Sequence, residues 1–142
     1  SRAVTVSPLS LVKVQDLSFG DVAAGTTGGT VVIDPDTGIR TVTGGVVALG
    51  GTVAAARFVG AGSARTNIAI IREPKGSILL TRAGGTETMM LDAFTLSGGG
   101  GASRKLDTDG TITFQVGGTL HVAANQMDGA YSGTFEVNID YH

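Results

Sequence analysis

The chain has 142 residues, of which 42% are hydrophobic and 15% are charged, and its formal net charge is -2. This length predicts one domain. The high hydrophobic and low charged fractions exclude an intrinsically disordered chain, and the slightly negative net charge excludes a strongly basic surface that binds nucleic acid. The absence of cysteine excludes disulfides, thiolate metal sites and cysteine nucleophiles, and the lack of any apolar run of about 18 residues predicts no membrane-spanning helix.

The first 20 residues are β-prone and are interrupted only by Pro8. Typical strands have about 5 to 6 residues, and proline is tolerated at a strand start or edge but not in mid-sheet. The break therefore predicts an N-terminal extension over residues 1–8 and a single β-sandwich domain over residues 9–142. Within the extension, Val4 and Val6 share one face.

The rest of the chain consists of short β-prone runs separated by turns rich in glycine. Their spacing of roughly 8 to 12 residues is typical of an all-β sandwich or barrel. The runs cover residues 9–20, 41–49, 55–59, 66–71, 77–81, 88–96, 111–124 and 131–141. Asp34–Gly38 and Asp107–Gly110 are predicted turns, because aspartate side chains hydrogen-bond turn backbone. Residues 98–101 are predicted to be a flexible loop.

Two glycines interrupt the alternation of residues 111–124. Ile112, Phe114 and Val116 precede Gly117 and Gly118, and apolar residues alternate again after them. The pair predicts either a bulge or bend within one long strand, or a tight turn between two short strands.

The clearest alternation covers residues 131–141. Polar residues separate the members of one apolar face, which are Tyr131, Gly133, Phe135, Val137, Ile139 and Tyr141. This pattern predicts a strand with one side on a core.

The titratable residues give little support for catalysis or for metal binding. His121 and His142 lie on predicted polar faces, and neither has a second histidine at the spacing of a metal site. Asp107 and Asp109 resemble only the opening of a calcium loop, so a turn is the better interpretation. No nucleophile elbow or phosphate loop is present. We expect no catalytic residue, no metal and no cofactor, and therefore a protein that is not an enzyme.

Several segments together carry a resemblance to a known group of proteins. They are Pro8–Leu11, Asp16–Gly20, Thr43–Val46, Val122–Gln126 and Tyr131–Phe135. In this order they resemble bacterial secreted domains of a family of unknown function, related to chaperone-usher pilins and to spore-coat-U-like fimbrial subunits. Tyr141 is next to last and Gly129 is fourteenth from the end, which resembles the C-terminal strand of these pilins.

The resemblance implies an incomplete immunoglobulin-like sandwich that lacks one strand and is completed by a donor strand from a neighbour. The donor residues would be Ala3, Val4, Val6 and Pro8, and residues 129–141 would form the assembly strand. The implied function is that of a structural subunit of an extracellular, cell-surface filament. Its implied partners are identical subunits, a periplasmic chaperone and an outer-membrane usher, and its export signal would already have been removed.

The sequence also fits a second hypothesis. A complete sandwich whose N-terminal strand pairs within its own chain would be a secreted, monomeric binding module for carbohydrate or another surface. Filament formation separates the two hypotheses.

Overall fold

The structure is a computed structural model that describes residues 7–73, 75–99, 101–128, 131–132 and 135–142. The described residues form strands and turns and contain no helix, which confirms the predicted all-β class. Among them, no helix is long and apolar enough to cross a membrane.

The strands of the described residues run antiparallel in every recorded pairing. In chain order they are β1 (Ser10–Gln15), β2 (Ser18–Phe19), β3 (Val22–Ala23), β4 (Gly29–Ile33), β5 (Arg40–Gly44), β6 (Val47–Ala48), β7 (Val53–Ala54), β8 (Ala56–Ala61), β9 (Asn67–Glu73), β10 (Ile78–Arg82), β11 (Thr88–Leu96), β12 (Ser103–Lys105), β13 (Thr111–Val122), β14 (Tyr131–Ser132) and β15 (Glu136–Tyr141).

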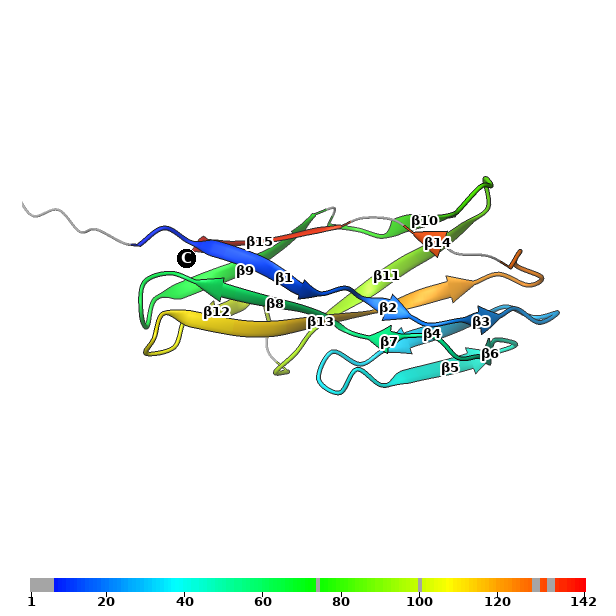
Figure 1. Cartoon of the computed structure of the whole chain (residues 1–142), viewed down its shortest axis with the longest axis horizontal. Coiled ribbons are helices and arrows are strands. Elements are labelled where there is room, and N and C mark those ends of the chain that lie inside the picture. The colour runs from blue at the N-terminus through cyan, green and yellow to red at the C-terminus, as the bar shows by residue number, and fades with distance from the viewer. Residues whose placement is uncertain (1–6, 74, 100, 129–130, 133–134) are drawn as a thin grey trace, which may run out of the picture.

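One large sheet dominates the fold. Its order is β1-β8-β13-β11-β10-β14, and β4 and β5 extend it from β13. A second sheet has the order β12-β9-β15, and the pairs β2-β7 and β3-β6 form two short ribbons. The large sheet curls, and the arrangement is compatible with a β-sandwich. In Figure 1, β9, β12 and β15 lie at the left, with the start of β1 and the C terminus, whereas β3, β6, β10 and β14 lie at the right.

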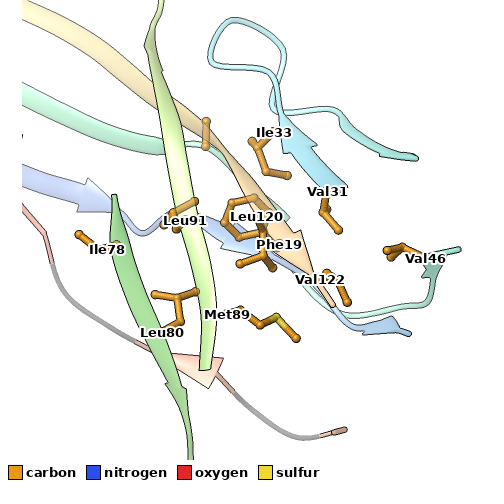
Figure 2. Packing of buried hydrophobic residues seen from close by; sticks show 11 residues of the cluster. Phe19, Val31, Ile33, Val46, Ile78, Leu80, Met89, Leu91, Leu120 and Val122 are labelled. Carbon is orange, nitrogen blue, oxygen red and sulfur yellow. The ribbon is translucent and has the colours of Figure 1, made fainter. Parts of the chain in front are cut away.

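Buried apolar side chains form two clusters along the long axis. The first, between the large sheet and β9 and β15, contains Phe58 and Phe114, whose ring centroids are 5.4 Å apart. The second lies under β4, β10, β11 and β13 and includes Val31, Ile33, Leu91 and Leu120 (Figure 2). Leu17, Phe94 and Phe135 are partly buried and pack against both clusters, so they join the two halves of the core.

β13 is one continuous strand of 12 residues, so the prediction of a single long strand is confirmed and the two-strand alternative is wrong. The irregularity lies on the partner strand, since the register of β11 shifts between Asp92, which pairs with Thr119, and Thr95, which pairs with Gly117. Ala93, inside the shift, has a φ of 50°. Gly117 admits the close approach of β4, because a Cβ there would lie 2.1 Å from the carbonyl oxygen of Ile33, and β4 pairs with β13 from Gly118 to Val122.

The prediction of one strand over residues 131–141 is wrong. β14 joins the large sheet beside β10, whereas β15 joins the second sheet beside β9. Phe135 belongs to neither strand. The apolar alternation nevertheless faces a core, because Val137 and Ile139 are buried and Tyr141 packs against their cluster. A chain that changes sheets can keep a period of two, so the alternation did not reveal the break.

Both predicted aspartate turns are confirmed. Asp34 Oδ1 accepts hydrogen bonds from the N–H groups of Asp36 and Thr37, at 2.8 and 3.0 Å. Asp107 Oδ1 accepts from the N–H groups of Asp109 and Thr111, at 2.8 and 3.0 Å. The backbone hydrogen bond from Thr37 is the main cause that lowers the pKa of Asp34, and the bond from Thr111 does the same for Asp107. Each carboxylate therefore has a structural role in its turn.

Candidate functional site

An apolar groove of about 720 Å³ lies beside the second cluster. One wall is formed by residues 17–24, which include β2 and β3, and the other by residues 126–128 together with Tyr131 and Phe135. Its floor consists of side chains from β10, β11 and β13, namely Ile78, Leu80, Met89, Leu91, Leu120 and Val122. Figure 2 shows these floor residues gathered beside Phe19. The groove thus opens directly onto the hydrophobic core.

The charged residues of the groove are few and of one sign. Among the described residues that line it, the charged ones are Asp21 and Asp128, and both are exposed. The groove therefore suits an apolar occupant without acidic side chains.

Strand edges border the groove on both sides. Among the described residues, β14 pairs only with β10, β2 only with β7 and β3 only with β6. Each of these strands therefore has one edge that no other described strand covers. Such edges are templates for pairing with a further strand.

Arg40 supports the first wall from behind. Its Nη1 donates hydrogen bonds to the carbonyl oxygens of Phe19 and Asp21, at 2.9 and 3.1 Å, and its Nη2 donates to that of Leu49. All three acceptor residues line the groove. A Cβ at Gly20 would lie 2.6 Å from Nη1, and Gly20 has a φ of 69°, so glycine leaves the space that the guanidinium occupies. One side chain thus binds two points of the first wall and joins them to Leu49, which also lines the groove.

We expect Arg40→Met to loosen this wall. The substitution keeps most of the apolar stem but removes the donors to three carbonyl oxygens, which should lower the free energy of unfolding by about 1 to 3 kcal/mol. Urea unfolding measures this loss, and hydrogen exchange should quicken for the amides of residues 19–23. Arg57→Met is the control, because Arg57 on β8 donates to Gln115 Oε1 at 3.3 Å and does not line the groove. Equal stability losses in the two variants would contradict the role of Arg40.

Tyr131 organises the second wall. Its hydroxyl donates to the carbonyl oxygen of Met127 at 2.6 Å and accepts from Gln126 Nε2 at 2.9 Å. Gln126 Nε2 also approaches the carbonyl oxygen of Thr88 at 3.2 Å. These bonds tie the segment after β13 to β14 and β11.

The predicted assembly residues are only partly brought together. Tyr131 and Phe135 line the groove, whereas Val137, Ile139 and Tyr141 pack against the other cluster. Pro8 is exposed and precedes β1. Ala3, Val4, Val6, Gly129 and Gly133 lie outside the described residues. The sequence analysis did not single out Arg40 or the role of residues 17–24 as a wall, since nothing local marks a side chain that binds three distant carbonyls.

The histidines lie apart from the groove. His121 Nε2 is 2.6 Å from Asp92 Oδ1 on a partly exposed face of the large sheet. The backbone N–H of His142 donates to Asn67 at 3.1 Å. Within the part of the chain that the structure describes, no group of three or more histidine, cysteine, aspartate or glutamate residues is placed to hold a metal ion.

Comparison with known proteins gives one family match. A family model described as "Domain of unknown function (DUF4402)" matches residues 9–141. The matched region contains every strand of the structure and begins directly after Pro8. The search of curated proteins and the search of solved structures found no match.

Proposed function

Because the chain belongs to the DUF4402 family, whose description names no activity, we propose its function from the groove: it is a structural subunit of an extracellular bacterial filament. In this proposal, the N-terminal segment of one copy lies as a strand in the groove of the next copy. The observation that carries the proposal is an apolar floor bordered on both sides by strand edges without a partner among the described residues.

The dimensions of the groove favour a strand as its occupant. The wall of residues 17–24, if extended at about 3.3 Å per residue, is about 26 Å long. Residues 1–6, at the same rise, would fill about 20 Å of that length. A strand in this place gains main-chain hydrogen bonds along its edges, and its alternate side chains, Val4 and Val6, cover the floor.

Residues 1–6 are too short to reach the groove of their own chain. Leu17 lies ten positions after Ser7, with β1 between them, and an extended chain covers about 33 Å over ten positions. Six extended residues span at most about 21 Å. The start of β1 and the right-hand end that holds β3 and β14 are also at opposite ends of the molecule in Figure 1. In this proposal, the donor is therefore another copy.

Contacts of this kind are head to tail. The donating end and the accepting groove are different surfaces of the chain, and such heterologous contacts extend into open filaments unless their rotation closes a ring. The resemblance to pilins supports the remaining parts of the proposal, which are a cell-surface location, export through the periplasm, and a chaperone and an usher as assembly partners.

The test compares the full chain with a variant that lacks residues 1–8. We expect the full chain to form filaments in negative-stain electron microscopy and the truncated chain to form none, because the donor is missing. A synthetic peptide of residues 1–8 should bind the full chain and inhibit its assembly.

Two results would overturn the proposal. If the truncated chain forms filaments as the full chain does, donation by residues 1–8 is wrong. If the full chain stays monomeric by size-exclusion chromatography and the peptide does not bind, the secreted monomeric binding module becomes the better hypothesis.

A further inference from the structure

Ser7, which joins residues 1–6 to the folded domain, takes part in a closed set of hydrogen bonds. We call Ser7 the root of the N-terminal segment. The N–H of Ser7 donates to Ser63 Oγ at 2.7 Å, and the carbonyl oxygen of Ser7 accepts from the hydroxyl of Tyr141. The N–H of Ser63 donates to the same hydroxyl at 2.9 Å. Both backbone groups of Ser7 are therefore bound, although Ser7 is exposed and lies before the first strand.

Gly62 lies directly beside the Tyr141 hydroxyl that binds Ser7. A Cβ at Gly62 would lie 2.8 Å from Tyr141 Oη and 2.6 Å from Leu9 Cδ2. Leu9 and Tyr141 are themselves partly buried against the first cluster. Glycine at position 62 therefore leaves the space in which the hydroxyl meets Ser7.

Pro8 restricts the backbone conformation next to Ser7. Pro8 has a fixed φ and restricts the preceding residue to extended conformations. With both its backbone groups bound, Ser7 has little conformational freedom.

We propose that Tyr141 is a positioning residue for strand donation: its hydroxyl holds Ser7 so that residues 1–6 project from the end of the subunit toward the groove of the next copy. This inference rests on the proposed function. Holding the root in advance removes part of the ordering cost of insertion, which raises the rate of productive assembly. Tyr141 would act on the donating subunit and not on the groove.

The chain offers a matched control. It has two tyrosines, and each donates its hydroxyl to a backbone carbonyl oxygen. Tyr141 holds the donor root, whereas Tyr131 holds a wall of the groove. The same substitution, Tyr→Phe, therefore removes one hydroxyl on the donating side or one on the accepting side.

The experiment measures two quantities on freshly diluted full-length chains. Light scattering gives the rate of assembly, and fluorescence anisotropy gives the affinity for a labelled synthetic peptide of residues 1–8. For Tyr141→Phe, we expect assembly to slow about fivefold while the peptide Kd stays unchanged. For Tyr131→Phe, we expect the peptide Kd to rise about fivefold. Ser63→Ala, which removes the acceptor for the Ser7 N–H, should slow assembly as Tyr141→Phe does.

The outcomes separate this inference from the proposed function. If the peptide binds and Tyr141→Phe assembles at the wild-type rate, the positioning role is wrong and the groove proposal stands. If Tyr141→Phe weakens peptide binding as much as it slows assembly, Tyr141 acts through the groove or the whole fold, which also overturns the inference. If the peptide binds none of the full-length chains, both proposals fail.

Discussion

A chain that carries Val6→Asp is expected to form no filaments under conditions in which the wild type does. In the proposed assembly, Val6 enters an apolar groove whose charged lining residues, among those described, are both aspartates. Burial of a carboxylate there would cost about 3 kcal/mol or more, which is roughly a hundredfold in affinity for each contact. Because a filament needs many contacts between a donated strand and a groove, the filament length should fall sharply. Negative-stain electron microscopy and size-exclusion chromatography measure this directly.

Val12→Asp is the matched control for this substitution. Val12 lies in β1 on the same N-terminal part of the chain, and its side chain is 60% exposed. The same change of charge at this position buries nothing, so the variant should assemble as the wild type does. Equal loss of filaments in the two variants would show that added negative charge, and not burial of residue 6, prevents assembly.

Acidification should partly rescue Val6→Asp. A carboxyl group in an apolar groove has its pKa raised above the ordinary value of about 3.9, because desolvation penalises the charged form. Assembly should therefore be absent at neutral pH and return as the pH falls toward that raised pKa. A turbidity series between about pH 7 and pH 4 would follow it, and a variant whose assembly improves with rising pH would contradict burial of residue 6.

Local patterns predicted most of the individual strands. β4 and β5 flank the predicted turn at Asp34, and β13 follows the turn at Asp107, because period-two alternation and turn-forming aspartates are both short-range signals. β12, at Ser103–Lys105, was not predicted, since two of its three residues are basic and its pairing with β9 is a tertiary feature. Short polar strands have no signal of their own.

No local pattern in the sequence predicts the groove. Its walls come from residues 17–24 and from residues after position 125, and nothing in either segment alone shows that they face each other. The sequence also does not show that the chain changes sheets between β14 and β15. Phe135 packs against both clusters, so its apolar character fits a strand, a crossover or a groove wall equally well.

Gly117→Ala is expected to cause a large loss of stability for the addition of a single methyl group. A Cβ at Gly117 would lie 2.1 Å from the carbonyl oxygen of Ile33 and 3.0 Å from the backbone nitrogen of Pro35. Both atoms belong to backbone, so neither can rotate away as a side chain would. β13 is also paired with β4 on one side and with β11 on the other at this level, so movement in either direction breaks a ladder.

The expected loss for Gly117→Ala is about 3 kcal/mol, at the upper end for overpacking. Gly118→Ala is the neighbouring control, because its Cβ would first meet the flexible end of Leu91 at 3.2 Å and should cost about 1 kcal/mol. Urea unfolding of both variants measures the difference, and similar midpoints would mean that β4 can move away from β13. Leu120 and Val122 of β13 form part of the groove floor, so a displaced β13 should also weaken binding of the peptide of residues 1–8. The glycine that the sequence presents as a break in a strand would then be a requirement both for folding and for the accepting groove.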